Sequence, residues 1–530
     1  MLILQNISYQ LPNKDLLFEN ISFSLIKHEK IALIGHNGVG KSSLLKIISK
    51  EFFPNDGLMK LESEPYSVPQ QFGQFDDLTI AGALKVETKI NALKEILNGH
   101  VTEKFLNDLN DDWPIEDRCR EALEYWDLIG LDLNQKLKNL SGGQKTKIFL
   151  AGIQIHQPEL ILMDEPSNHL DSYGRKQLYE FIQSTNSSLI VVSHDRKLLN
   201  HLNGIYELSP NGIKIYGGNY EFYKEQKQIE NNALSNDIQS KEKALKKAKQ
   251  KERETLERKQ KLDARGKRQQ EKSGTARIMM NTLRNNAENS ASKLKNVHTE
   301  KIENISHELR ELRSSQSGFE QMKFGLDSSS LHKGKILFAA SDLNFGYDEK
   351  FIWKENLDFQ ILSGERVVVR GINGSGKTTL IKLILGSLAP QTGQMLRVEN
   401  RSVYIDQDYS LIDDKKSVYE QAQHSNQSGM EEHEVKIRLN RFLFPKEDWD
   451  KPCAALSGGE RMRLLLCCLT INSQSPDVIV LDEPTNNLDL QNIEILTAAI
   501  NEYRGTLLVV SHDVCFLEQI KVERAIELRN

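Results

Sequence analysis

Apolar residues gather in short blocks at both ends of the chain, and several blocks are followed by a stretch with helical spacing. IALIG (31–35) and VVVRG (367–371) are apolar runs that end in glycine, and SLLKIIS and TLIKLIL follow them. Four more runs are almost continuously apolar: ELILMDE, SLIVVSHD, DVIVLDE and TLLVVSHD. Such runs are typical of strands buried on both faces of a parallel sheet. Strands alternating with helices predict the α/β fold class.

This pattern occurs twice, because four motifs recur in the same order at nearly one spacing. GHNGVGKS returns as GINGSGKT, LSGGQ as LSGGE, LILMDEPSNHLD as VIVLDEPTNNLD, and VVSHD occurs in both halves. The second copies follow the first at nearly the same distance along the chain in all four cases. A repeat of this size indicates a duplicated domain. We therefore predict domains at 1–220 and 326–530, with residues 221–325 belonging to neither.

The segment between the two copies predicts a long helical hairpin. Residues 221–325 contain no proline, and up to about residue 273 they are mainly Lys, Glu, Gln, Ala and Arg, which are good helix formers. Leu, Ile and Ala then recur at the spacing of a helical seam from Leu283 to Leu312. A break near Ser273-Gly274, with Gly266 as a second candidate, places the tip at about 262–290. A helix of about 50 residues would be roughly 75 Å long.

Charge is unevenly distributed along the chain. The 530 residues carry a net charge of −5, but residues 241–299 hold 18 Lys and Arg against 7 Asp and Glu, and the remainder carries −16. A basic helical segment favours binding to a polyanion, and a solvated charged linker is the alternative. Ile278, Met279 and Met280 lie among the basic residues, which is unusual in a spacer. The candidate polyanion-binding residues are Arg265, Lys267, Arg268, Lys272, Arg277 and Arg284.

Composition narrows the class of protein. No apolar run approaches the ~18 residues that a membrane helix needs, and Met1 leads almost directly into a predicted strand without a signal-peptide pattern. The five cysteines, an odd number, form no CxxC or other metal-binding spacing. We expect a protein of the reducing cytoplasm that does not span a bilayer.

Each copy carries a loop suited to bind a nucleoside triphosphate. GxxxxGK[ST] directly after an apolar strand forms a loop whose backbone N–H groups surround phosphates, and the N-terminus of the next helix points at the same charge. The loop lysine would reach the β- and γ-phosphates, and the hydroxyl beside it would hold Mg²⁺. These pairs are Lys41 with Ser42 in the first copy and Lys377 with Thr378 in the second.

The apolar strand that ends in Asp-Glu supplies the other half of each site. Asp164 and Asp482 would bind Mg²⁺ through water. Glu165 and Glu483 follow directly, where a carboxylate can polarise an attacking water. An isolated carboxylate after a strand is more often a helix cap, but here the phosphate loop precedes it and His-Asp follows it in both copies. The pattern therefore predicts hydrolysis.

Together these motifs resemble the ATP-binding cassette family, whose discriminating signature is LSGG[QE]. The resemblance covers both ends of the chain and implies that two cassettes close face to face over two ATP molecules. Each ATP would be held by the loop of one cassette and the signature of the other. His194 and His512 would act as His switches beside the catalytic glutamates, and both sites would hydrolyse ATP.

The resemblance also assigns the nucleotide-binding residues. Tyr9 and Tyr347 match the adenine-stacking aromatic, although a Tyr at a strand end is as often part of core or edge packing. In the first copy the other matching residues are Gly35, Asn37, Gly38, Gly40, Lys41, Ser42, Ser43, Gln70, Ser141, Gly142, Gly143 and Gln144. In the second they are Gly371, Asn373, Gly374, Gly376, Lys377, Thr378, Thr379, Gln407, Ser457, Gly458, Gly459 and Glu460.

Two cassettes, no membrane segment and a long basic connector resemble the ABC-F proteins, the translation-factor branch of the superfamily. YGGNYEFYKEQK (216–227) is similar to the start of that family's connector, while SNHLD (167–171) and TNNLD (485–489) each depart from its usual D-loop at one position. The resemblance implies a cytoplasmic, monomeric ATPase that binds the ribosome when closed around ATP. Its connector would reach toward tRNA and the peptidyl-transferase centre, and hydrolysis would release it. Translation regulation, relief of stalling and antibiotic resistance are the implied roles.

Three other classes stay open: a DNA-binding or repair ATPase, the ATPase subunit of a membrane importer, and a non-enzymatic ribosome-associated scaffold. The predicted tip has no CxxC, and no basic or coiled-coil stretch follows His512, which both count against a DNA-binding protein. Intact Glu165 and Glu483 count against a scaffold. Residues 86–113 lengthen the first copy and predict polar helices, either a partner-binding arm or a longer helical subdomain.

Overall fold

The computed structural model describes residues 1–12, 14–270, 296, 299–313, 332–347, 350–427, 429–472 and 475–529. Contacts divide the chain into two units, Met1–Glu221 with Gln321–Asn530, and Phe222–Glu320. The first unit contains both cassettes, and the second contains the helical connector.

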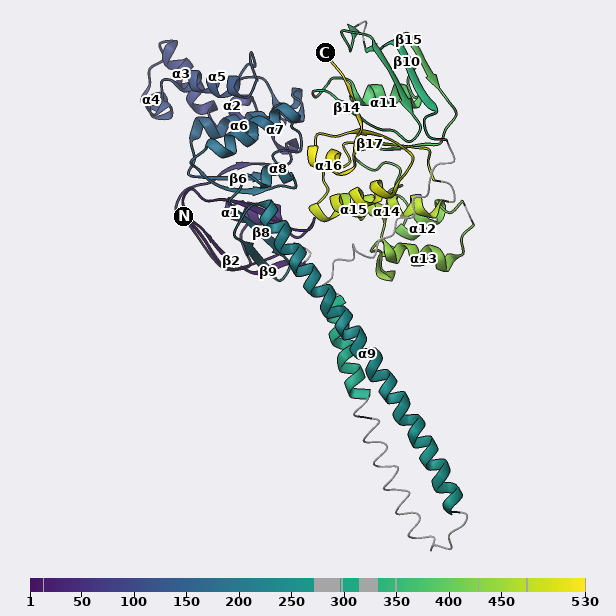
Figure 1. Ribbon diagram of the computed structural model, residues 1–530. Helices are drawn as coiled ribbons and strands as arrows, with labels where there is room; N and C mark the ends of the chain where they lie inside the picture. The colour runs from purple at the N-terminus through teal and green to yellow at the C-terminus, as the bar shows by residue number, and fades with distance from the viewer. Residues whose placement is uncertain are drawn as a thin grey trace. The chain divides into compact units, whose positions relative to one another are not determined.

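The first cassette consists of two sheets with helices packed on them (Figure 1). The antiparallel sheet has the order β2 (Leu16–Leu25), β1 (Leu2–Gln10), β4 (Asp56–Leu61). The second sheet has the order β5 (Tyr66–Val68), β6 (Leu160–Asp164), β7 (Ser188–Val192), β3 (Lys30–Ile34), β8 (Gly204–Ser209), β9 (Gly212–Tyr216), and only the β8–β9 pair is antiparallel. Its helices are α1 (Lys41–Ile48), α2 (Ile80–Ala83), α3 (Glu87–Leu97), α4 (Glu103–Leu109), α5 (Ile115–Tyr125), α6 (Gly142–His156), α7 (Ser172–Ser184) and α8 (Arg196–Leu199).

The second cassette repeats this architecture. Its antiparallel sheet has the order β13 (Leu357–Leu362), β10 (Ile336–Asn344), β15 (Thr392–Arg397), and β11 (Gly346–Tyr347) pairs with β12 (Lys350–Phe351). Its parallel sheet has the order β16 (Ser402–Ile405), β17 (Val478–Asp482), β18 (Thr506–Val510), β14 (Arg366–Arg370), β19 (Arg524–Glu527). The helices are α11 (Lys377–Leu385), α12 (Val418–His424), α13 (Glu432–Arg441), α14 (Gly458–Ile471), α15 (Leu490–Glu502) and α16 (Val514–Gln519).

The continuously apolar runs form the centre of each parallel sheet, as predicted. β7 and β18 are buried along their whole length, and only the final Asp of β6 and of β17 is partly exposed. β3 lies beside β7, and β7 beside β6, all parallel. The carboxyl ends of these three strands therefore meet at one edge of the sheet, where α/β proteins bind their ligands.

The turn from β3 into α1 requires glycine. Gly40 has φ 101°, a left-handed backbone conformation, and a Cβ there would lie 2.7 Å from Leu17 and 2.8 Å from Phe18. α1 begins at the next residue, Lys41. The same conformation recurs at Gly376 of the second cassette, where φ is 85°. The glycines of the two loops therefore set the direction of the helices that follow.

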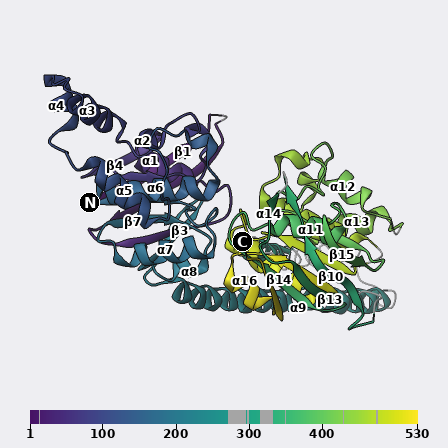
Figure 2. The same cartoon turned by 90° about the horizontal axis from the view of Figure 1, so that it is seen from above.

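The polar stretch at 86–113 of the first cassette is helical, as predicted. α3 and α4 pack on each other at the outer edge of the cassette in both views (Figures 1 and 2). The side chain of Thr102 caps α4 by accepting a hydrogen bond from the backbone N–H of Phe105. Asn110 ends α4 in the left-handed conformation.

The connector begins with one long helix, α9 (Tyr220–Gln270), of 51 residues. At about 1.5 Å per residue its length is about 75 Å. Residues 299–313 form a second helix that runs back beside α9 (Figure 1). Arg313 pairs with Glu242 at 2.6 Å, Lys241 pairs with Glu308, and Ile238 and Leu309 are buried. The hairpin prediction is thereby supported over this part of the connector.

The predicted tip of the connector is described only in part. Arg265 is exposed on α9. Lys267 and Arg268 belong to the last turn of α9, but their side chains lie outside the described residues, as do Lys272, Arg277 and Arg284 altogether.

Within the described ranges, no helix combines the length and the apolar character required to cross a bilayer.

Replacing Leu162 by Ala in β6 should lower the free energy of unfolding of the first cassette by about 2–5 kcal/mol. Leu162 is 1% exposed in the core of that cassette, so its removal leaves a cavity that the sheet cannot close. Thermal and urea unfolding followed by circular dichroism measure the change. Ile129→Ala is the control, because Ile129 is 77% exposed and its loss should cost less than about 0.5 kcal/mol.

Candidate active sites

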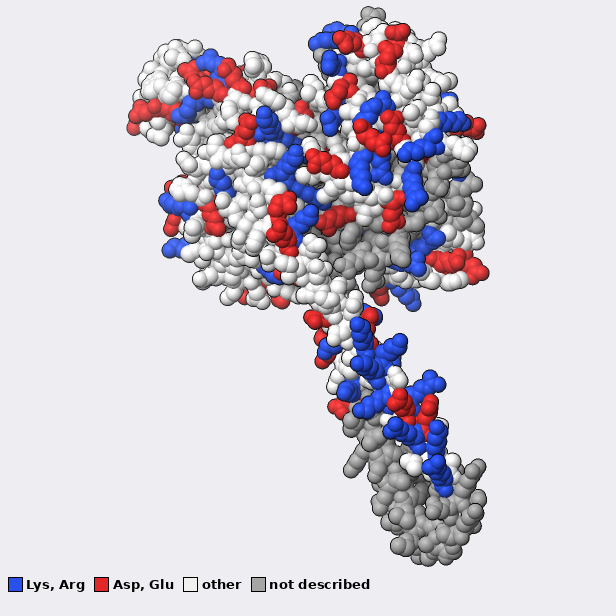
Figure 3. All heavy atoms as spheres, viewed as in Figure 1, with Lys and Arg blue, Asp and Glu red and all other residues white. Residues whose placement is uncertain are grey.

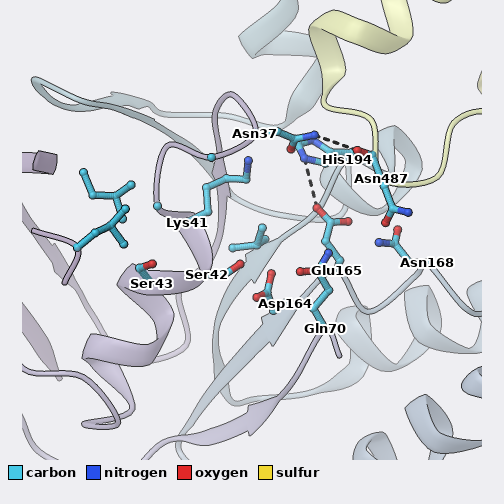
Figure 4. A pocket seen from close by; sticks show the side chains of 15 residues that line it. Asn37, Lys41, Ser42, Ser43, Gln70, Asp164, Glu165, Asn168, His194 and Asn487 are labelled. Carbon is cyan, nitrogen blue, oxygen red and sulfur yellow. Dashed lines mark hydrogen bonds and ion pairs between the residues drawn. The ribbon is translucent and has the colours of Figure 1, made fainter. Parts of the chain in front are cut away.

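The first site lies where the carboxyl ends of β3, β6 and β7 meet (Figure 4). A cavity of about 390 Å³ opens there, and Leu11, Leu17, Asn168, Val192 and Asn487 form part of its wall. Of the residues predicted from sequence, it is lined by Asn37, Gly38, Gly40, Lys41, Ser42, Ser43, Gln70, Asp164, Glu165 and His194. We use "first site" for this cavity and "second site" for the corresponding residues around Lys377 and Glu483.

The loop lysines are held by the carbonyl groups of their own loops. The Lys41 ammonium donates to the carbonyl oxygens of Gly35 at 2.7 Å and His36 at 3.0 Å. Lys377 makes the corresponding bonds to Gly371 at 2.9 Å and Ile372 at 3.2 Å. Burial lowers the pKa of both lysines, and nearby carboxylates oppose that shift. Each ammonium group therefore lies near carboxylates and is held in position by the carbonyl groups of its own loop.

The first-site carboxylates are buried and short of partners. Burial raises the pKa of Glu165 well above its usual range, and the adjacent Asp164 adds to the shift. Burial also raises the pKa of Asp164, although a hydrogen bond from Ser42 opposes it. The Nε2 atom of His194 is 3.4 Å from Oε1 of Glu165. Burial and the charge of Lys41 lower the pKa of His194 to about 3, so the imidazole is neutral.

The second site has the same geometry with more hydrogen bonds. Thr378 and Tyr404 both donate to Oδ2 of Asp482, at 3.1 and 2.9 Å. Burial raises the pKa of Glu483 to about 7, opposed by the charges of Arg175 and Lys377. Burial and the same two cations lower the pKa of His512 to about 3, so it too is neutral.

The glutamate in each site has a backbone conformation that residues other than glycine rarely adopt. Glu165 has φ 49° and Glu483 has φ 48°, both in the left-handed region. The N–H of Glu165 donates to the carbonyl of Val192 at 2.8 Å, and that of Glu483 donates to Val510 at 2.8 Å. One hydrogen bond from the glutamate N–H to the neighbouring strand thus helps hold each carboxylate in place. Such strain is typical of functional sites.

The residues present fit ATP with Mg²⁺. Oδ1 of Asp164, both carboxylate oxygens of Glu165 and Oε1 of Glu483 are buried without a hydrogen-bond partner among the described residues. These oxygens can accept from water and from a hydrated cation. Within the same residues, no cluster of three or more His, Cys, Asp or Glu could hold a metal. Mg²⁺ keeps several waters and uses few protein ligands beside substrate phosphates.

The D-loops make several of the contacts between the two cassettes. The backbone N–H of Asn37 donates to Asp489 at 3.1 Å, and the Asn37 side chain donates to the carbonyl of Asn487 at 2.9 Å. In the opposite direction, Asn373 donates to the carbonyl of His169 at 3.1 Å. Each phosphate loop is therefore bonded to the D-loop of the other cassette.

The signature residues serve as helix caps and do not line the first-site cavity. Ser141 and Gln144 form a capping box at the start of α6, and Ser457 and Glu460 form one at the start of α14. A Cβ on Gly143 would lie 3.6 Å from Asn373, so this signature glycine is close to the opposite phosphate loop. Gly142, Gly458 and Gly459 lie beside the D-loop or its following helix in their own cassettes. The pairing of loop and signature over one nucleotide remains a prediction.

The two predicted adenine-stacking tyrosines differ. Tyr9 stacks on Phe52 at 5.8 Å between ring centroids and is absent from the cavity wall, which Leu11 and Leu17 form instead. Tyr347 is 55% exposed, and its hydroxyl lies 3.4 Å from Oγ1 of Thr379 beside the loop. Gln407 is exposed in the turn after β16. Leu11 and Leu17 belong to no motif, so the sequence does not indicate that they line the cavity. Asn168 and Asn487 also line it, and they could have been found because they belong to the repeated D-loop motif.

This combination of phosphate loop, signature helix, Asp-Glu strand end and His switch defines an ATPase of the cassette class. The family model described as "ABC transporter" matches residues 18–168 and 354–486. The chain belongs to this ATP-binding cassette family and, within it, to the tandem-cassette ABC-F proteins. It hydrolyses ATP with Mg²⁺.

Relatives share the whole tandem arrangement. The "ATP-binding protein Uup" of Escherichia coli (strain K12) is 30% identical over 531 residues, covering 96% of this chain and 77% of that protein. The "Putative ATP-binding protein YdiF" of Bacillus subtilis (strain 168) is 30% identical over 540 residues, covering 97% and 78%. The solved structure described as "RNase-L Inhibitor" shares the fold with a TM-score of 0.59 at 19% identity, covering 99% of this chain and 87% of that one. An archaeal ribosome recycling factor, aABCE1, solved with stalk protein aP1, has a TM-score of 0.58 at 17% identity, covering 98% and 87%.

Glu483→Gln should stabilise the nucleotide-free protein at pH 8 and much less at pH 5. The folded pKa of about 7 lies above the ordinary 4.5, so between these values the folded protein retains a proton that the unfolded chain has released. Stability therefore falls as pH rises through this window, by up to about 3 kcal/mol, and the neutral glutamine removes that loss. Calorimetric unfolding from pH 5 to 8 measures it. The exposed Glu399→Gln should leave the pH profile unchanged.

Proposed function

We propose that this protein is a cytoplasmic ABC-F ATPase that binds the ribosome when its cassettes are closed around ATP. Its basic connector contacts RNA, toward tRNA and the peptidyl-transferase centre, and hydrolysis releases it. The proposed cassettes are residues 1–220 and 326–530, with the connector at 221–325. Translation regulation, relief of stalling and ribosome protection against antibiotics are the roles that this arrangement serves.

The charge along α9 is the observation that carries the proposal. Positions 220–240 of α9 hold 2 Lys and Arg against 4 Asp and Glu, while positions 241–270 hold 13 against 5. Lys and Arg side chains gather over the described part of this helix (Figure 3). Positive charge thus increases with distance along the chain from the first cassette. A helix needed only as a spacer has no reason to acquire that gradient.

RNA is the polyanion that suits these features. Contacts between lysine or arginine and phosphate give strong binding that depends on salt and little on sequence. The two helices of the hairpin pack through buried residues such as Ile238 and Leu309, and their charged residues face outward. Such a hairpin is narrow enough to enter a space lined by phosphate groups. The aABCE1 protein, which shares the fold, is described as a ribosome recycling factor. Family membership in ABC-F supports the same partner.

The site residues would couple ATP to this binding. Lys41 and Lys377 would hold the β- and γ-phosphates, and Asp164 and Asp482 would hold Mg²⁺, which offsets phosphate charge. Glu165 and Glu483 would accept a proton from the attacking water, with His194 and His512 beside them. ATP would favour the closed form because it adds contacts that only the closed form makes, and hydrolysis removes them.

The Glu165→Gln, Glu483→Gln double variant should sediment with 70S ribosomes in the presence of ATP and not without it. The variant retains the phosphate loops but lacks the groups that activate water, so it stays closed. Ultracentrifugation through a sucrose cushion measures the bound fraction. Adding Lys41→Ala and Lys377→Ala should abolish it, because phosphate is no longer held. ATP-dependent binding to branched DNA or membrane vesicles, with no ribosome binding, would overturn the proposal.

Replacing Lys246, Lys247, Lys249 and Lys251 by glutamine should weaken ribosome binding at every salt concentration. All four side chains are exposed on α9. Loss of up to four phosphate contacts should reduce the slope of log K against log salt by about 3. The matched control replaces four exposed lysines of the cassettes: Lys60, Lys176, Lys382 and Lys521. Equal effects of both sets would show that α9 has no special contact with RNA.

A further inference from the structure

The histidine of the second site has a hydrogen bond to a residue of the first cassette. Among the described residues, the histidine of the first site has no corresponding bond to the second cassette. Ser172 is the first residue of α7, directly after the D-loop residue Asp171. Its Oγ atom lies 3.2 Å from Nδ1 of His512 in the second cassette. Nε2 of the same imidazole lies 3.3 Å from the Lys377 ammonium and 3.5 Å from Oε1 of Glu483. Both ring nitrogens of His512 are therefore in polar contact.

His194 in the first site lacks this second contact. Asp171 and Asp489 end the two D-loops, so Leu490 of the second cassette stands where Ser172 stands in the first. A leucine side chain offers no hydrogen bond. Nδ1 of His194 is buried and has no hydrogen-bond partner in the part of the chain that the structure describes. One of the two otherwise equivalent histidines is thus fixed at one ring nitrogen only.

The next turn of α7 repeats the difference. Arg175 is buried, donates to the carbonyl of Leu170 at 3.2 Å and lies 3.8 Å from Asp195. Its charge acts on Glu483 and His512 in the second cassette. The same alignment places the buried apolar Ile493 opposite the first site. At these two corresponding positions, α7 therefore offers polar groups to the second site, and α15 offers apolar side chains to the first.

A hydrogen bond at one imidazole nitrogen decides what the other nitrogen can do. It limits rotation of the ring and selects its tautomer. The Lys377 ammonium can only donate, so Nε2 of the neutral ring accepts from it. The ring proton then resides on Nδ1, which donates to the hydroxyl oxygen of Ser172. A ring already oriented loses less freedom on reaching the transition state, so the reaction is faster.

We propose that Ser172 is a positioning residue that acts in trans on His512, so that the second site hydrolyses ATP faster than the first. The inference concerns turnover alone and does not depend on the ribosome. It rests on the proposed roles of Glu165, Glu483, His194 and His512.

The test uses the full-length protein with one site silenced at a time. In the Glu165→Gln background only the second site turns over, and there Ser172→Ala should lower kcat about threefold to tenfold with KM unchanged. In the Glu483→Gln background the same change should alter kcat less than about 1.5-fold. Ser172→Thr should restore the second site, because threonine keeps the hydroxyl. Ser172 is exposed, so the alanine variant should fold normally.

A second measurement does not require turnover. The ¹⁵N resonances of the imidazole groups are recorded on histidine-labelled protein, and the variants His512→Gln and His194→Gln assign the two signals. In Ser172→Ala the Nδ1 resonance of His512 should shift, and that of His194 should not. Equal loss of kcat in both backgrounds, no rescue by threonine, or an unshifted His512 signal would overturn the inference. If the double glutamine variant still hydrolyses ATP, the site assignment itself fails, which is a different result.

Discussion

Each cassette is organised around a carboxylate that must stay inside the protein at the end of a parallel strand. Burial raises the pKa of Glu165 and Glu483, and among the described residues neither accepts a hydrogen bond from a cationic side chain that would offset it. The backbone enters the left-handed region to place these side chains. Only a rigid sheet core can sustain both costs. The fully buried strands β7 and β18 therefore have two roles: they form the core of each sheet, and their carbonyl groups hold the two glutamates in position.

Much of this arrangement follows from the sequence, because the motifs sit at strand ends and helix starts. There the element itself fixes the backbone, so Lys41 and Asp164 could be placed together from their motifs, and the resemblance to the cassette family added His194. The residues expected to contact adenine could not be predicted in this way. Whether Tyr9 or Leu11 reaches the cavity depends on packing around an antiparallel sheet. Contacts such as Asn37 with Asn487, 450 residues apart, depend on how two folded cassettes meet. No local pattern encodes that.

Duplication has left the two cassettes similar where phosphate is held and different where they meet. The phosphate loops, strand ends and histidines make corresponding contacts in both copies. The D-loops read SNHLD and TNNLD, and in the helices after them Ser172 and Arg175 of one cassette correspond to Leu490 and Ile493 of the other. Charge has diverged as well, since the basic residues are concentrated in the connector and the cassettes are acidic overall.

Both halves of each site are encoded in one chain, and this affects how the protein responds to dilution. Asn37 and Asp489 meet as parts of the same molecule, so their encounter is a first-order event with an effective concentration set by the connector. How often the two cassettes meet is therefore independent of how much protein a cell contains. A defective half cannot be replaced by a sound half from a neighbouring molecule while its own partner remains tethered. Damage to one site therefore affects the molecule that carries it and is not relieved by intact molecules around it.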